Sequence, residues 1–213
     1  MGMSADKLAK ALHDAQGAPG EPTSELKGMA AAIVAEVSTM SIVTFLPATI
    51  NGVAPSSGGP LSNGSGSGGT ILGPTGPTLA AQMVAKMGKG GTTPQMLGFA
   101  TGVTTHLLTG KVSFSPGNIT GVCTNSPTSG GTVTGAGSKG KIGGLSASAM
   151  AQLIVTGLGQ TEVTDRVKKM CEAIVSHLTN DAEVSFTMGG VVGAASAGGG
   201  PIIAGAGTAG KVS

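Results

Sequence analysis

One short stretch of the sequence has the residue types and spacing of a phosphate-binding loop. Residues 135–141 are GAGSKGK, which fits G-x-x-x-x-G-K, and their glycines alone fit G-x-G-x-x-G. Loops of the first kind hold nucleotide phosphates on backbone N–H groups, and loops of the second kind hold a dinucleotide at the start of a helix. If this stretch worked in either way, the chain would be a nucleotide-binding protein.

The residues around this stretch complete neither motif. A phosphate loop needs Ser or Thr after its lysine to hold Mg²⁺, but Ile142 follows Lys141. A dinucleotide loop needs an acidic residue about 20 positions further on. Gln160 stands at that place, and Glu162 is the nearest acid. We therefore expect structural glycines here and no bound nucleotide or other cofactor.

A second group of residues has the chemistry of a metal site. The internal repeat described below aligns Glu36, His106 and His177 at one position of three related helices. Two imidazoles and one carboxylate around a threefold axis would suit a divalent metal. The alternative is a solvated or interfacial polar position near a helix C-terminus, where histidine also suits the helix dipole. We favour the alternative, because nothing in the sequence shows that the three positions converge, and we assign no catalytic residue.

These candidates belong to a unit that the chain repeats three times. Val-x-Phe triads end at Phe45, Phe114 and Phe186, and each is followed by a β-branched residue and a double glycine. A G-x-G-x-x-G segment comes next in every copy and ends on an aliphatic residue. The copies span residues 1–73, 74–144 and 145–213.

The elements of each copy can be predicted from its periodicity. Two amphipathic helical patterns precede each Val-x-Phe triad, and two strands and a glycine-rich strand follow. The fold class is therefore α+β. An open stack would need atypical capping repeats, and the end copies are not atypical. We expect a closed pseudo-threefold ring in which Val212 lies where Leu8 can follow it.

The repeated glycine segments are predicted packing surfaces. Glycine lets another backbone approach closely, and a flexible linker would not keep the same spacing three times. We expect these positions to be closely approached by another unit or subunit: Gly64, Gly66, Gly135, Gly137, Gly205 and Gly207.

The composition narrows the classes of partner. Only 10% of the residues are charged, the net charge is +2, and four Phe are the only aromatic residues among 213. A nucleic-acid-binding surface needs clustered basic residues for the phosphates and aromatic rings on which bases stack, so this composition argues against nucleic-acid binding. The sequence contains no run of 18 apolar residues, so it predicts no membrane-spanning helix.

The cysteines and the low charge bear on the setting of the chain. Cys123 and Cys171 are expected to be reduced thiols, with any redox role left open. Because so little charge favours burial in an assembly, we expect a homo-oligomer that also contacts other structural proteins.

The glycine-rich, Ser/Thr-rich and Trp-free repeats resemble small repetitive virion proteins of tailed bacteriophages, such as tail, baseplate or capsid-decorating components. This resemblance implies a virion location after synthesis in the host cytoplasm, symmetric packing against other structural proteins, and no catalysis. The alternative is a ligand- or surface-binding module such as an adhesin tip, because flat Thr- and Gly-rich strands can form such surfaces. A secretion signal would favour the alternative, and none is visible in the sequence.

Overall fold

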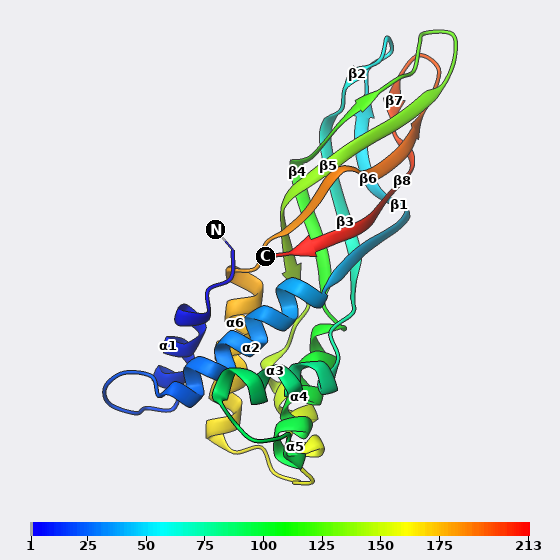
Figure 1. Ribbon diagram of the computed structural model, residues 1–213. Helices are drawn as coiled ribbons and strands as arrows, with labels where there is room; N and C mark the ends of the chain where they lie inside the picture. Colours follow the sequence, from blue (N-terminus) through cyan, green and yellow to red (C-terminus); the bar gives the residue numbers. More distant parts are fainter. Residues whose placement is uncertain (1) are drawn as a thin grey trace. The chain divides into compact units, whose positions relative to one another are not determined.

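A computed structural model describes residues 2–213 and has an α+β fold (Figure 1). The chain divides into two compact units, one helical and one made of strands. The helical unit holds the segment ending at Ser41 together with Gly73–Gly110 and Gly144–Ala182. The strand unit holds Ile42–Leu72, Lys111–Gly143 and Glu183–Ser213. Each expected copy thus contributes two helices to one unit and one hairpin to the other.

The helical patterns predicted from the sequence form six helices within residues 2–213. They are α1 (Ala5–Ala15), α2 (Ser24–Met40), α3 (Gly76–Met87), α4 (Pro94–Leu107), α5 (Ala147–Gly157) and α6 (Asp165–Asn180). Every helix follows a Ser or Thr whose hydroxyl accepts a hydrogen bond from a backbone N–H three residues later. These side chains satisfy donors that the first helical turn leaves free, and so they set where each helix starts.

The helices pack in chain order and close on themselves. Each helix contacts the next one along the chain, and α6 also contacts α1. Glycines bring α4 and α5 close together: a Cβ at Gly98 would lie 2.2 Å from the carbonyl oxygen of Gly157. Glycine inside a helix lowers the intrinsic stability of that helix, but Gly98 and Gly102 in α4 allow the close contact with α5. No helix in the described part of the chain is both long and apolar enough to span a bilayer.

The strand unit is a closed antiparallel barrel of six long strands (Figure 1). They are β1 (Ile42–Ala54), β3 (Ser62–Leu72), β4 (Lys111–Cys123), β5 (Gly131–Gly143), β6 (Val184–Ala195) and β8 (Ile203–Val212). Two-residue strands β2 (Gly59–Pro60) and β7 (Gly200–Pro201) lie beside β4 and β1. Neighbours pair in the order β1, β3, β4, β5, β6 and β8, and β8 pairs with β1 to close the barrel.

One detail of the predicted unit is wrong: the two strands expected before each glycine segment form a single strand. In β1 the pairing with β3 lapses between Thr44 and Ile50, and Ala48 has a φ of 68°. Gly117 in β4 and Gly189 in β6 have φ values of 87° and 89°. An unpaired residue at such a bulge bends a strand without ending it, so no turn is needed there.

Candidate functional site

The three Phe side chains of the Val-x-Phe triads meet inside the barrel. Phe45, Phe114 and Phe186 come from β1, β4 and β6, and each is 2–3% exposed. The distances between their ring centroids are 5.7, 5.8 and 5.7 Å, and the planes of each pair are tilted or edge-on. Aromatic rings attract one another in such geometries. The centre of the barrel is therefore filled with side chains.

Glycines of the G-x-G-x-x-G segments make room for these rings. A Cβ built on the last glycine of each segment would lie 2.4–2.7 Å from a ring carbon, which is closer than real contacts allow. The pairs are Gly69 with Phe45, Gly140 with Phe114, and Gly210 with Phe186. Any larger residue at these positions would displace an aromatic ring.

The six glycines predicted as packing positions lie in the same barrel strands. The first of each pair faces a neighbouring backbone, where a Cβ would lie 2.1–2.2 Å from a carbonyl oxygen; these are Gly64, Gly135 and Gly205. The second of each pair lies next to the aromatic rings; these are Gly66, Gly137 and Gly207. The close approach at all six is made by other strands of the same barrel.

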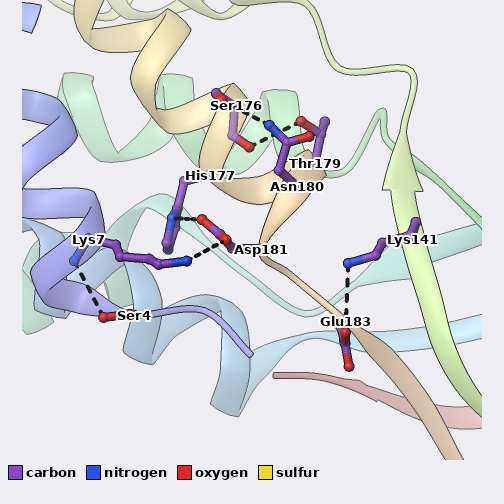
Figure 2. A network of polar contacts seen from close by, with 9 residues as sticks. All are labelled: Ser4, Lys7, Lys141, Ser176, His177, Thr179, Asn180, Asp181 and Glu183. Carbon is purple, nitrogen blue, oxygen red and sulfur yellow. Dashed lines mark hydrogen bonds and ion pairs between the residues drawn. The ribbon is translucent and has the colours of Figure 1, made fainter. Parts of the chain in front are cut away.

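The stretch that resembles a phosphate loop lies within strand β5. The strand continues to Gly143, and α5 begins only at Ala147. The stretch pairs with β4 and β6, with a register irregularity around Lys139, whose φ is 58°, and it does not lead directly into a helix N-terminus as a phosphate loop does. Lys141 Nζ lies 3.9 Å from Glu183 Oε1 (Figure 2). Lys141 therefore has a partner within the strand unit.

The three residues considered as metal ligands lie at separate places in the helical unit. Glu36 on α2 is 1% exposed and accepts hydrogen bonds from three groups, two at the start of α3 and one from its second turn. These are the backbone N–H of Thr75 at 3.0 Å, the hydroxyl of Thr78 and the amide of Gln82 at 2.7 Å. The Glu36 carboxylate therefore joins the end of α2 to the N-terminus of α3.

His106 makes the corresponding contact between α4 and α5. Its Nε2 accepts a hydrogen bond of 2.8 Å from the backbone N–H of Ser146, the residue that caps α5. The bond requires that Nε2 carry no proton. Burial lowers the pKa of His106 below its ordinary value, because the charged ring would lose water. The neutral ring that this contact needs is thus favoured.

His177 on α6 contacts Asp181 instead. Its Nδ1 lies 2.8 Å from Asp181 Oδ2, and Lys7 on α1 lies 3.1 Å from the other oxygen of Asp181 (Figure 2). Burial lowers the pKa of His177, and the Asp181 carboxylate partly opposes this. The hydrogen bond from Lys7 lowers the pKa of Asp181. His177 Nε2 is buried and has no hydrogen-bond partner among the described residues.

No three His, Cys, Asp or Glu side chains gather as a metal-binding group within residues 2–213. The two thiols are also buried. Burial and the nearby Glu172 raise the pKa of Cys171 to about 12, and burial raises that of Cys123. A thiol must lose its proton to react as a nucleophile, so both cysteines are held in an unreactive form.

A hollow of about 410 Å³ lies in the helical unit beside α1 and α6. His13, Arg166, Glu25 and three methionines are among the residues that line it. Arg166 donates a hydrogen bond of 2.6 Å to Gln16, and Glu25 is paired with Lys89. The nitrogens of His13 are too buried for a water-sized group to reach. Two of the charged groups that line the hollow, Arg166 and Glu25, therefore already have partners.

Sequence reasoning missed two features of these sites. It did not predict that the three Phe rings meet, although the occurrence of one Val-x-Phe triad and one G-x-G-x-x-G segment in each copy was a signal. It also did not predict that Glu36 and His106 bind the caps of following helices, which local sequence does not encode.

No protein-family model, curated protein or solved structure matches this chain.

Proposed function

We propose that this chain is a non-catalytic structural component of a symmetric assembly, built as a closed pseudo-threefold ring of three helix-helix-hairpin units. The Phe cluster carries the proposal. One ring comes from each expected copy, and the three centroid distances differ little, at 5.7, 5.8 and 5.7 Å. A triplicated unit arranged about an axis accounts for both facts.

Backbone irregularities support the same arrangement. The residue before the last glycine of each G-x-G-x-x-G segment has a positive φ: 77° at Gly68, 58° at Lys139 and 57° at Ala209. Positive φ is uncommon outside glycine, and here it recurs at one position of all three copies. The bulges at Ala48, Gly117 and Gly189 form a second such set.

The absence of catalysis is supported by how the polar side chains are used. Glu36 and His106 are both occupied in joining helices, and the barrel interior holds aromatic and aliphatic side chains. Catalysis needs a nucleophile, an acid or a base that can reach a substrate. In a tailed-phage virion, as part of a tail, baseplate or capsid decoration, such a chain would act through its surface alone.

Two measurements test this proposal. Electron microscopy and light scattering of the purified chain should show closed symmetric oligomers. A mass-spectrometric inventory of purified phage particles should contain the chain in fixed stoichiometry with other structural proteins. A chain that stays monomeric at all concentrations and is missing from every particle would refute the proposal.

One observation favours the alternative of a surface-binding module. Exposed hydroxyls cover the outer side of three neighbouring strands, β3, β4 and β5, and include Ser113, Thr120 and Thr134. Hydroxyls can bind polar ligands such as glycans. Saturable binding on a glycan array that Thr120→Val weakens would favour the adhesin-like alternative over a role in a particle.

A further inference from the structure

Almost the whole outer surface of the barrel lacks charge. Residues 42–72, 112–138 and 184–210 contain no Asp, Glu, Lys or Arg. The charged residues of the strand unit are Lys111, Lys139, Lys141, Glu183 and Lys211. All five lie toward the end of the barrel where β4 and β6 begin and β5 and β8 finish. Ordinary proteins carry charge on about a quarter of their residues, so this surface is unusual.

The uncharged surface has two different sides. Strands β6, β8 and β1 are neighbours and expose six large apolar side chains: Ile42 at the start of β1, and Leu46, Val53, Met188, Val192 and Ile203. We name the last five residues the apolar wall. Leu46 is 70% exposed and Met188 is 66% exposed. The opposite strands, β3, β4 and β5, expose mainly Ser and Thr and add only Val122 and Leu72 to the large exposed apolar side chains.

Strand pairing makes the apolar wall continuous. Ala194 on β6 pairs with Ile203 on β8, and Val192 pairs with Ala206. On the other side of β8, Gly207 pairs with Phe45, the residue before Leu46. Val192 and Ile203 therefore lie on adjoining stretches of β6 and β8, and Leu46 and Met188 lie at the bulges of β1 and β6 on either side of β8. Because the barrel is closed, a partner would bind this wall through side chains and not by adding a strand.

We propose that the apolar wall is the contact surface between two copies of this chain, an inference that rests on the proposed structural function. A protein with an ordinary charged surface would bury charges against a wall that offers them no partner, at a high desolvation cost. A second copy presents the same uncharged wall and buries no charge. Two identical walls can meet around a twofold axis, which is the commonest symmetry of homo-oligomers.

The alternative of a lipid surface fits less well. Segments that lie in membrane interfaces combine apolar side chains with Trp or Tyr and with Lys or Arg. The chain has no Trp and no Tyr, and its four Phe do not lie on the apolar wall. None of the five charged residues of the strand unit belongs to the wall either.

Lysine substitutions on the two sides of the barrel provide the test. Met188→Lys and Leu46→Lys place a charge on the apolar wall, and Thr120→Lys and Ser115→Lys are matched controls on β4, which pairs with none of the strands of the wall. Sedimentation and light scattering across a concentration series should show a self-associating parent. We expect the wall variants to raise the dissociation constant at least about tenfold and the controls to leave it unchanged.

A labelling experiment covers the case in which a lysine variant misfolds. Both native cysteines are buried, so Met188→Cys and Thr120→Cys each add one reactive thiol. Maleimide should label Met188→Cys slowly at high protein concentration and faster on dilution. It should label Thr120→Cys, on β4, at one rate throughout.

The outcomes separate this inference from the proposed function. Oligomers that Met188→Lys leaves intact, while Met188→Cys is labelled at a constant rate, would overturn the wall contact and leave a symmetric assembly standing. Equal loss of association in wall and control variants would also overturn it. Binding to neutral phosphatidylcholine vesicles that Met188→Lys abolishes, with no self-association of the parent, would assign the wall to lipid instead. The particle inventory tests the proposed function independently.

Discussion

At the scale of single residues, the barrel depends on pairing the smallest side chain with a large one. Gly69, Gly140 and Gly210 leave space that aromatic rings fill. Packed interiors have few voids, so the ring and the missing side chain must match in volume. This explains how a chain without Trp or Tyr fills the centre of a six-stranded barrel.

Gly140→Ala should therefore lower the stability of the protein. The added methyl group would lie 2.5 Å from the ring of Phe114, so the ring or the strand must move. Overpacking of this kind costs about 1–3 kcal/mol. The measurement is chemical unfolding of the variant beside the parent.

Gly143→Ala is the matched control in the same strand. Its methyl group would meet only the carbonyl oxygen of Lys111, at 4.0 Å. Its free energy of unfolding should stay within about 0.5 kcal/mol of the parent's, the range usual for neutral substitutions. Equal changes in the free energy of unfolding at the two positions would show that the space beside the Phe rings does not require glycine.

At the scale of secondary-structure elements, buried polar groups join consecutive helix pairs. Glu36 links α2 to α3, and His106 links α4 to α5. Both accept a hydrogen bond from the backbone of the residue that caps the following helix. His177 instead pairs with Asp181, which Lys7 on α1 also contacts. The closing contact between α6 and α1 thus uses different chemistry.

Glu36→Ala should destabilise the helical unit more than Glu36→Gln. Alanine removes the acceptor of three part-buried hydrogen bonds to Thr75, Thr78 and Gln82, and a hydrogen bond contributes about 0.5–1.5 kcal/mol to stability. Glutamine keeps one acceptor oxygen for Thr75 and Thr78. Thermal unfolding of both variants measures the difference. If the two variants were equally stable, the hydrogen bonds of Glu36 would contribute nothing to the helix junction.

Acidification should weaken the helix junctions. The pKa values of His106 and His177 are both below their ordinary 6.5, so the unfolded chain binds protons more readily than the folded chain. The stability they provide is complete above pH 6.5 and is lost as the pH falls from there toward their folded pKa values. Asp181 also has a lowered pKa, but its contribution is lost only below its ordinary 3.8.

Denaturant unfolding between about pH 8 and pH 5 would measure this loss. His106→Gln should reduce the slope, because the glutamine oxygen can accept from Ser146 without titrating. His13→Gln is the comparison variant, since neither ring nitrogen of His13 has a hydrogen-bond partner within residues 2–213. A parent whose stability is constant over this range would contradict the role given to His106.

At the scale of the whole molecule, charge is distributed very unevenly. The strand unit has five charged residues among its segments, and the other 17 of the chain's 22 lie in the helical unit. Salt screens interactions between charges but strengthens apolar contacts only modestly. Self-association through the apolar wall should therefore change little between low and moderate sodium chloride. Sedimentation at several salt concentrations tests this, and a steep weakening with salt would point to the charged helices as the contact.

Part of this architecture follows from the sequence alone. All six helices were predictable, because a Ser or Thr cap, an apolar period and a closing glycine or polar residue act within a few positions of the chain. The α+β class was predictable for the same reason. The same local patterns predicted two strands where β1, β4 and β6 each form a single one, because a bulge and a turn both contain residues with positive φ.

Only the tertiary structure decided what these elements enclose and expose. The order of the six strands and the meeting of the three Phe rings depend on pairing between residues far apart in sequence. Whether Glu36 binds a metal or caps α3 depends on which helix end lies beside it. The apolar wall exists because β6 and β1 both pair with β8, which brings Met188 and Leu46 to one side. Local patterns predict which face of a strand is buried, but strand order decides which exposed faces become neighbours.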